Sequence, residues 1–474
     1  MIATSQEVYS VLQQYNPWWH RQPILDLPTW SRASFQELYT WLARPPSHRA
    51  VLVSGARQVG KTTLLMQAAQ QLIADGVPPA SILYVTFDHP LLKLVGLERI
   101  LGYWYEFQPM TTDIEYLLLD EIQYTNDWQT WVKHQVDFFK RRRIALTGSA
   151  MPLNQASQES GVGRWHVIKL PTLSFYEYLQ IKEIEPPDLP RPRSLAQVLD
   201  WSAADHIKVS VAARPLVAHF HEYLLRGGFP QTARVESVSM AQKLLREDIV
   251  DKVLKRDMTA LYGVRRVLEL ERTFLYLCLH DGGLLDVGAI CSQLALNKQT
   301  VNSFIDLLEA AHLIYRLPRF GHGKEILRAK SKIYLADPAI SGSVMLRGRA
   351  LLEDGAKLGA AVETAVFKHI FARYYQTSIG FSYWQSKAGH EVDIVCEAEG
   401  MTIPFEVKYT RKPVGKSDLK GLLQFTSEKN LPRGYVITQL LDDFGPIETG
   451  TATRLWRIPA VLACWWLSQS ETVR

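Results

Sequence analysis

The sequence predicts an α/β protein whose first folded part is a parallel sheet with helical crossovers. Short, continuously apolar runs alternate with amphipathic helices between residues 49 and 170, as expected for parallel strands buried on both faces. A glycine-rich loop joins the first of these runs to a helix. Mixed helix and alternating strand patterns return between residues 360 and 460, which indicates a second α/β part.

The composition indicates a folded and modular protein. Hydrophobic residues make up 47% and charged residues 21% of the 474 residues, which excludes disordered and fibrous classes. At roughly 150 residues per domain, the length predicts about three domains. The net charge is only +5, so any surface that binds nucleic acid must be local.

Neither a membrane segment nor a metal motif is evident. The start, MIATSQEVYS, lacks the basic and apolar regions of a signal peptide. No apolar run approaches the roughly 20 residues that span a bilayer, and no lipid anchor is recognisable. The four cysteines, Cys278, Cys291, Cys396 and Cys464, are far apart and form no zinc-binding pattern. We therefore expect a cytoplasmic protein with no membrane partner.

Residues 1–48 form an aromatic-rich segment with Trp18, Trp19, Trp30 and Trp41 among polar residues and prolines. The aromatic side chains could stack on nucleic-acid bases. Aromatic clusters near a terminus more often pack against the adjacent core, and we favour that interpretation.

The glycine-rich loop has the spacing G-x-x-x-x-G-K-[ST], in which backbone N–H groups surround phosphate oxygens at a helix N-terminus. Lys61 would contact the β- and γ-phosphates, and the Thr62 hydroxyl would ligate Mg²⁺. An apolar run from Ala50 to Ser54 precedes the loop, and a series of helix formers follows it. The expected nucleotide-binding residues are Gly55, Ala56, Arg57, Gln58, Val59, Gly60, Lys61, Thr62 and Thr63.

Two acidic residues end a later apolar run. Asp120 and Glu121 follow Tyr116–Leu119. Such a pair often merely caps a strand with charge. Downstream of a phosphate loop, Asp120 is instead expected to hold Mg²⁺, while Glu121 orients or deprotonates the attacking water.

Two further polar groups are candidates for the same site. Ile144–Leu146 is a predicted strand that ends in Thr147, Gly148 and Ser149, and either hydroxyl could sense the γ-phosphate at the carboxyl edge of the sheet. Arg164 is a candidate arginine finger, supplied by the same or a neighbouring subunit. An ordinary solvated arginine is an equal alternative.

These segments have a specific resemblance. VLVSGARQVGKTTLL, YVTFD, LLLDEIQ, ALTGSA and GRWHVIKLPTLSFYEYL, in this order, resemble the prokaryotic AAA-type ATPases whose C-terminal half is a domain of unknown function. The resemblance covers most of the chain and implies binding and hydrolysis of ATP. KSKIYLADPAI also resembles this family.

Four prolines in residues 185–194 mark a linker, and helical periodicity follows. Residues 268–320 then show the order of a winged helix-turn-helix, with Asn297 as the N-cap of its third helix. Val301, Ile305 and Leu308 share one face of that helix. The next stretch is basic and could hold phosphates. Its cations are Arg316, Arg319, Lys324, Arg328, Lys330 and Lys332, beside one acid, Glu325.

The last candidate site lies in residues 384–408. Two strands are expected, Glu391–Cys396 and Met401–Lys408, joined by a turn at Gly400. Asp393 and Glu406 would chelate Mg²⁺ and Lys408 would position water for phosphodiester hydrolysis. Glu363, on the preceding helix, is a candidate third carboxylate.

These segments look like the PD-(D/E)XK restriction-endonuclease-like fold, although a bare D…E-x-K pattern is common by chance. Basic residues follow the motif and could attract phosphates. They are Lys408, Arg411, Lys412, Lys416 and Lys420.

The predicted organisation has five parts. They are the aromatic-rich segment at 1–48, an AAA-type ATPase domain at 49–185, a Pro-rich linker and helical connector at 186–265, a winged helix at 266–340 and the nuclease-like domain at 341–474. We expect an ATPase that uses ATP and Mg²⁺ and couples nucleotide state to a DNA-handling, and in one version nucleolytic, C-terminal half. The alternative is a nucleotide-switched interaction or signalling protein whose nuclease-like domain is inert. A homo-oligomer or a protein partner is compatible with both.

Overall fold

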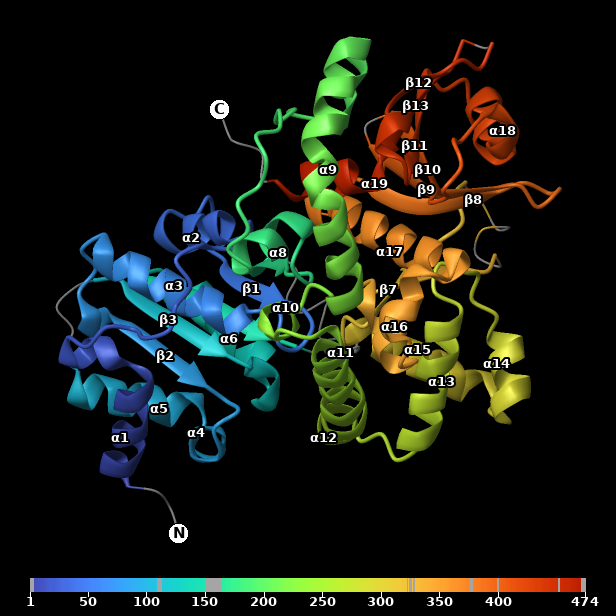
Figure 1. Ribbon diagram of the computed structural model, residues 1–474. Coiled ribbons are helices and arrows are strands. Elements are labelled where there is room, and N and C mark those ends of the chain that lie inside the picture. The colour runs from blue at the N-terminus through green and yellow to red at the C-terminus, as the bar shows by residue number, and fades with distance from the viewer. Residues whose placement is uncertain are drawn as a thin grey trace. The chain divides into compact units, whose positions relative to one another are not determined.

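The chain is described by a computed structural model (Figure 1). The structure describes residues 4–108, 113–149, 163–321, 323, 326, 329–375, 378–398, 400–450 and 452–469. The chain divides into two compact units. The first contains residues 1–170 and 310–312, and the second contains residues 171–309 and 313–474. The main division, after Leu170, lies ahead of the boundary predicted at 185.

The first unit is a five-stranded parallel sheet with helices on both faces, in the strand order β2-β3-β4-β1-β5. Its strands are β1 (Ala50–Ser54), β2 (Ile82–Thr86), β3 (Glu115–Asp120), β4 (Arg142–Gly148) and β5 (Trp165–Lys169). Its helices are α1 (Ser5–Tyr15), α2 (Phe35–Ala43), α3 (Lys61–Ala74), α4 (Pro90–Val95), α5 (Leu97–Phe107) and α6 (Trp128–Phe138). The predicted parallel α/β fold is confirmed.

The two faces of this sheet are covered by different helices. Leu52, Leu117 and Leu146 point to one face and form a core with α1, α5 and α6. The alternate residues of each strand point to the other face, where α2 and α3 pack. In Figure 1, α2 and α3 lie above the sheet and α1 and α5 below it. Strands β1 to β4 are mostly buried and rich in apolar residues, and this allowed their prediction from the sequence. The edge strand β5 is less buried and was not predicted.

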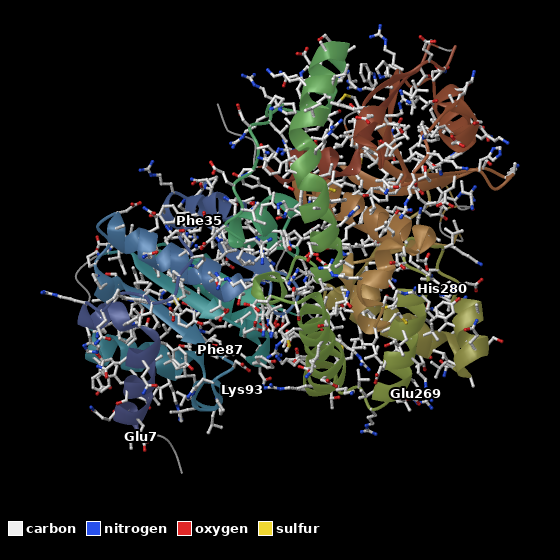
Figure 2. All side chains as sticks on the ribbon, viewed as in Figure 1. Glu7, Phe35, Phe87, Lys93, Glu269 and His280 are labelled. Atoms are coloured by element: carbon white, nitrogen blue, oxygen red, sulfur yellow. The ribbon has the colours of Figure 1, made fainter. Side chains whose placement is uncertain are left out.

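The aromatic N-terminal segment packs against this core. The indole N–H groups of Trp18 and Trp19 both donate to the Ile82 carbonyl, at 3.1 and 3.0 Å. Trp41 stacks on His166 with ring centroids 4.3 Å apart. Phe87, labelled in Figure 2, is also fully buried. The packing interpretation of these tryptophans is therefore confirmed.

The second unit begins with helices and ends with a mixed sheet. Its helices are α8 (Phe175–Ile181), α9 (Ala203–Arg226), α10 (Pro230–Arg234), α11 (Val238–Arg246), a π-helix (Glu247–Asp257), α12 (Met258–Tyr262), α13 (Val267–Leu279), α14 (Val287–Leu294), α15 (Lys298–Ala310), α16 (Ala339–Val344), α17 (Gly355–Tyr374), α18 (Lys420–Glu428) and α19 (Ala460–Ser468). Its strands are β6 (Ile314–Leu317), β7 (Lys332–Leu335), β8 (Gly380–Gln385), β9 (Glu391–Ala398), β10 (Met401–Lys408), β11 (Arg433–Thr438), β12 (Gly445–Ile447) and β13 (Arg454–Pro459).

The six-stranded sheet has the order β12-β13-β11-β10-β9-β8. β9 and β10 form the predicted antiparallel hairpin, with Phe405 opposite Ile394. β10 then pairs in parallel with β11, and β11 with β13. This arrangement brings the carboxylates of β9 and β10 to the centre of the sheet.

The middle of the second unit has the element order that the sequence predicted. Helices α13, α14 and α15 are followed by the antiparallel hairpin β6–β7. Asn297 caps α15 by accepting the Thr300 N–H at 2.8 Å, and Val301, Ile305 and Leu308 are fully buried. Assignment of this region as a winged helix stays a prediction.

The proline-rich stretch before α9 has no regular secondary structure, as predicted. It is nevertheless anchored, because Leu189 is buried and the Trp466 indole donates to the Pro190 carbonyl at 3.0 Å.

Among the residues that the structure describes, no helix is long and apolar enough to cross a membrane.

Candidate functional sites

The phosphate loop joins β1 to α3 and has the backbone that its glycines predict. Gly60 has φ +98°, a left-handed conformation that glycine adopts without strain. Gln58 also has a positive φ, +63°. A Cβ on Gly55 would lie 2.2 Å from the Leu170 carbonyl oxygen. The first glycine is therefore required by close packing against the chain that follows β5.

Lys61 is held inside the loop. Its side chain is 3% exposed, and its ammonium donates to the carbonyls of Gly55 and Ala56 at 3.2 and 2.9 Å. The same nitrogen lies 3.8 Å from a Glu121 carboxylate oxygen. A single cation thus connects the loop to the acidic pair, 60 residues away in sequence.

Asp120 ends β3, whose neighbours in the sheet are β2 and β4. Its carboxylate therefore lies at the centre of the site, where hydroxyl groups from α3, β2 and β4 reach it. The Thr62 hydroxyl donates to Asp120 Oδ2 at 2.7 Å, and the Tyr84 hydroxyl donates to the same oxygen at 2.8 Å. Thr147, at the end of β4, donates to Asp120 Oδ1. Burial and the neighbouring Glu121 charge raise the pKa of Asp120. A divalent cation at this position would offset both effects, so Thr62 and Asp120 suit a Mg²⁺ ion delivered with a nucleotide.

Glu121 is oriented by its own set of contacts. Its N–H donates to Thr147 Oγ1 at 3.0 Å, and its carboxylate accepts from the Ser149 hydroxyl at 3.3 Å. Gln123 donates both to that carboxylate and to Ser149 Oγ, the latter at 3.1 Å. The sequence left Thr147 and Ser149 as alternatives, and the structure separates them: Thr147 contacts both acids, whereas Ser149 contacts only Glu121.

Arg164 lies at the other edge of the sheet. It precedes β5, whose first residue pairs with Ala50, while the phosphate loop follows Ser54 at the opposite end. Five residues of strand span about 16 Å. Arg164 forms an ion pair with Asp137 at 3.4 Å. Its position is away from the phosphate loop of its own subunit, and the role of an arginine finger stays a prediction. Supply from a neighbouring subunit stays a prediction.

Sequence reasoning missed three contributors to this site. Tyr84 on β2 contacts Asp120, and Gln123 contacts Glu121, as described above. Arg32, which is 7% exposed, donates to the Val59 carbonyl at 2.7 Å and so supports the loop from the N-terminal segment. Strand order brings Tyr84 to Asp120, and the sequence alone does not contain that order. Gln123, three residues after Asp120, was readable as part of LLLDEIQ.

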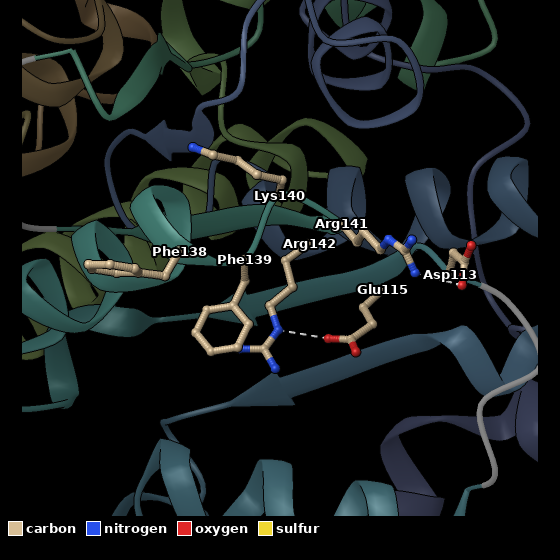
Figure 3. Close-up of a pocket in the computed structure, with 7 residues that line it drawn as sticks. All are labelled: Asp113, Glu115, Phe138, Phe139, Lys140, Arg141 and Arg142. Carbon is tan, nitrogen blue, oxygen red and sulfur yellow. Dashed lines mark hydrogen bonds and ion pairs between the residues drawn. The ribbon is translucent and has the colours of Figure 1, made fainter.

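A pocket in the first unit is distinct from the phosphate loop (Figure 3). It has a volume of about 470 Å³ and is lined by Asp113, Glu115, Phe138, Phe139, Lys140, Arg141 and Arg142. Glu115 begins β3 and Asp120 ends it. The pocket therefore lies at the amino edge of the strands, away from the candidate nucleotide site, and its Arg142 is engaged by Glu115 at 2.7 Å.

In the second unit, two of the predicted carboxylates, Glu363 and Asp393, form ion pairs with a buried lysine. Lys332 Nζ lies 2.7 Å from Glu363, 2.7 Å from Glu391 and 2.8 Å from Asp393. Burial lowers the pKa of Lys332, but the charges of Asp393 and Glu363 outweigh burial and hold it well above its ordinary value. Burial likewise raises the pKa of Asp393, but the Lys332 charge and hydrogen bond prevail and lower it.

Glu406 and Lys408 form a second pair beside this group. Their charged atoms are 2.5 Å apart. Burial and the Asp393 charge raise the pKa of Glu406 to about 8, and burial and the Asp393 charge raise that of Glu363 to about 7. The four residues predicted for phosphodiester hydrolysis are thus brought together, with Lys332 and Glu391 as members that the sequence did not indicate.

In the expected basic stretch from Arg316 to Lys332, the cations that the structure describes are engaged by protein groups. Lys332 is 2% exposed, so its assignment to a phosphate-binding surface is wrong. Arg316 pairs with Asp306 at 2.8 Å, and Lys330 with Asp286 at 2.5 Å. Arg319 donates to the Gln385 carbonyl. Lys324, Glu325 and Arg328 lie outside the described residues.

Nothing in the described part of the chain forms a ready metal centre from protein side chains alone. Among the residues that the structure describes, no group of three or more His, Cys, Asp and Glu side chains is arranged to hold a metal ion. The four cysteines are free thiols.

Three regions of the chain match known families. Residues 47–179 match a family described as an AAA domain. Most of this match lies in the first unit. Residues 217–350 and 358–458 match two domains of unknown function, DUF8612 and DUF4143. The matches thus follow the expected order, an AAA domain and then domains of unknown function.

The curated relatives include uncharacterised proteins from bacteria and an archaeon. A protein of Haemophilus influenzae is 28% identical over 345 residues, which cover 69% of this chain and 76% of that protein. One of Mycobacterium tuberculosis is 26% identical over 378 residues, or 77% of this chain and 72% of the relative. One of Methanocaldococcus jannaschii is 24% identical over 399 residues, or 82% and 80%.

Among solved structures, a mutant RuvB of Thermotoga maritima aligns with a TM-score of 0.29 and 17% identity, covering 63% of this chain and 89% of that one. AMPPCP-bound DnaA from Aquifex aeolicus aligns with a TM-score of 0.25 and 16% identity, covering 58% and 86%.

Proposed function

We propose that the first unit binds ATP with Mg²⁺ and hydrolyses it. One observation carries this proposal: the Thr62 hydroxyl of the phosphate loop donates to Asp120 at 2.7 Å, while Lys61 of the same loop lies 3.8 Å from Glu121. The cation, the hydroxyl and both carboxylates that phosphoryl transfer requires therefore occupy one place.

Each residue has a separate role in this proposal. The N–H groups of the loop and the Lys61 ammonium bind the phosphates, and Lys61 offsets charge that develops on the γ-phosphate. Thr62 and Asp120 would hold Mg²⁺, which supplies further charge neutralisation. Glu121 orients the attacking water and accepts its proton, because Ser149 and Gln123 fix the direction of its carboxylate.

The test is ATP hydrolysis by the full chain and three variants. We expect Lys61→Ala to lose hydrolysis by about 100-fold or more. Glu121→Gln should keep ATP binding and lose hydrolysis by a similar factor. Lys140→Ala is the matched control, since Lys140 lines the pocket at the opposite edge and should hydrolyse ATP normally. Equal rates for wild type and Lys61→Ala would overturn the assignment.

A second candidate function is contact with nucleic acid through the C-terminal domain. Arg411, Lys412, Lys416 and Lys420 are all exposed within ten residues, and we name them the 411–420 cluster. Phosphate contacts of this kind give affinity without sequence readout. Lys408 does not join the cluster, because Glu406 engages it.

Binding of a labelled DNA duplex, followed by fluorescence anisotropy over a salt series, tests this second function. Replacing Arg411, Lys412 and Lys420 by alanine should weaken binding and lower the slope of log K against log salt by about 0.9 for each phosphate that the variant no longer neutralises. The control replaces Lys243 and Lys255, exposed on other helices. Unchanged binding in the triple variant would contradict a role for the cluster.

A further inference from the structure

Three carboxylates of the second unit converge on one nitrogen. Lys332 Nζ lies within 2.7–2.8 Å of Glu363, Glu391 and Asp393. An ammonium group has three N–H donors, and these three acceptors use all of them. The carboxylates come from α17 and β9, whereas the lysine comes from β7.

A divalent metal does not suit this arrangement. Mg²⁺ requires oxygen ligands at about 2.0–2.1 Å in octahedral geometry, and the point on which the carboxylates converge is filled by the ammonium. The second Asp393 oxygen accepts the Val407 N–H at 2.8 Å. The Tyr334 hydroxyl donates to the Glu363 oxygen that also contacts Lys332. Both Asp393 oxygens and the Glu363 oxygen that faces Lys332 are thus already engaged.

Glu406 is the one predicted ligand that does not contact Lys332. One of its oxygens pairs with Lys408, and the other is buried without a hydrogen-bond partner in the structure. A single carboxylate oxygen does not make a metal site. If the lysine is removed, however, this unpartnered oxygen is available as a further ligand beside the freed carboxylates.

Lys332 is fixed in place by its surroundings. Its side chain is 2% exposed. Its backbone pairs with Leu317 on β6 and bridges to Leu284 on the other side. Withdrawal of the ammonium would leave three carboxylates without their cation, which is strongly unfavourable in a buried site. The lysine is therefore a permanent part of the cluster.

We propose that Lys332 is the resident cation of this carboxylate cluster, so that the C-terminal domain takes no divalent metal and does not cleave phosphodiesters. The lysine belongs to the region that matches DUF8612, and Glu363, Glu391 and Asp393 belong to the region that matches DUF4143. One domain thus supplies the cation that the other domain's acids require. The cluster is a structural junction in which an ammonium stands where a nuclease has its metal.

The first test is calorimetric titration of the nucleotide-free full chain with Mn²⁺. Wild type should show no binding that depends on Asp393. Lys332→Ala frees the carboxylates and should bind one Mn²⁺ at least tenfold more tightly than wild type, and the added substitution Asp393→Asn should abolish that gain. If Lys332→Ala gains no Mn²⁺ affinity, the lysine does not occupy a metal's place and the proposal is overturned.

The second test needs no lysine variant and so survives a folding defect of Lys332→Ala. Thermal unfolding of wild type should be the same with EDTA and with Mn²⁺, and plasmid DNA incubated with wild type and Mn²⁺ should stay intact. An EDTA-sensitive melting temperature, or nicking that Asp393→Asn abolishes, would overturn the proposal. Both readouts are independent of ATP hydrolysis, so failure here leaves the ATPase assignment untouched.

Discussion

The Lys368 ammonium lies 3.3 Å from the Asp337 carboxylate, and the two side chains are 1% and 0% exposed. Asp337 also accepts the Thr172 hydroxyl at 2.6 Å and the Gly228 N–H at 2.9 Å. Lys368 donates to Thr172 Oγ1 and to the Leu173 carbonyl. The ion pair therefore anchors the first residues of the second unit to α17.

Loss of this lysine should destabilise the second unit severely. Lys368→Met leaves the Asp337 carboxylate buried without its cation, which costs about 3–5 kcal/mol. Denaturant unfolding measures the change. The control is Lys255→Met, which breaks the exposed pair with Asp251 and should leave the stability nearly unchanged. A Lys368→Met variant no less stable than this control would contradict a structural role for the pair.

His369, the next residue, should make the protein sensitive to acid. Its Nδ1–H donates to the Ala365 carbonyl at 2.6 Å and its Nε2 accepts the Phe175 N–H at 2.9 Å, so the folded protein holds it neutral. Burial and the Lys368 charge lower its pKa to about 3, below the unfolded value of about 6.5. Its stabilising contribution is therefore complete above about pH 6.5 and is lost as the pH falls toward 3.

The expected difference is measurable well before the protein unfolds. Between pH 7 and pH 5 wild type should lose about 2 kcal/mol more unfolding free energy than His369→Gln, since one pKa unit is about 1.4 kcal/mol. Parallel stability curves for the two proteins over this range would contradict the prediction.

Gly55 should not tolerate a side chain. Because a Cβ there would lie 2.2 Å from the Leu170 carbonyl oxygen, Gly55→Ala should displace the loop and weaken ATP binding by about tenfold or more. Gly102→Ala is the matched control: Gly102 lies in α5 with nothing within 4 Å of its Cβ position. That change should preserve ATP binding and stabilise the helix by up to about 1 kcal/mol. Nucleotide titrations of both variants check the contrast.

Tyr84 should tune the affinity for Mg²⁺. Tyr84→Phe removes a hydrogen bond that favours the charged form of Asp120, so the pKa of that carboxyl should rise further. A hydrogen bond to a charged group contributes about 1.5–3 kcal/mol, and we expect the Mg²⁺ concentration for half-maximal hydrolysis to rise about tenfold. Tyr103→Phe, on α5, serves as the control. An unchanged Mg²⁺ dependence would exclude this role.

Arg164 precedes the amino end of β5, away from the phosphate loop, so we predict that it serves ATP from a neighbouring subunit. Under this hypothesis Arg164→Ala and Lys61→Ala are each inactive alone, and mixing them restores part of the hydrolysis, since one contributes the intact phosphate loop and the other the intact arginine. Absence of complementation, together with a monomeric mass in light scattering with ATP, would remove Arg164 from the site.

The first unit was predictable because its signals are local. The phosphate loop occupies consecutive residues between a buried strand and a helix, and Asp120 directly follows the apolar run Tyr116–Leu119 of β3. Partners that depend on strand order were not readable, as the contact between Tyr84 and Asp120 shows.

The second unit shows the same limit more severely. The hairpin that carries Asp393 and Glu406 was predicted from alternation and a glycine turn, and Glu363 from its helix. Lys332, 61 residues before Asp393, looked in sequence like one more cation of a basic stretch. Its burial follows from the contact of β7 with α17 and β9, which is long-range in sequence, and no local pattern encodes that.

Two ion pairs fasten the β7 segment to α17 with opposite polarity. Lys332 pairs with Glu363, and Asp337 pairs with Lys368. Each segment thus carries one positive and one negative side chain. The spacing from Lys332 to Asp337 equals the spacing from Glu363 to Lys368. Sliding one segment against the other would bury unpaired charge, whereas apolar contacts alone would tolerate a shift. The two ion pairs therefore favour a single register between the two segments. They determine how the regions that match the two domains of unknown function align with each other.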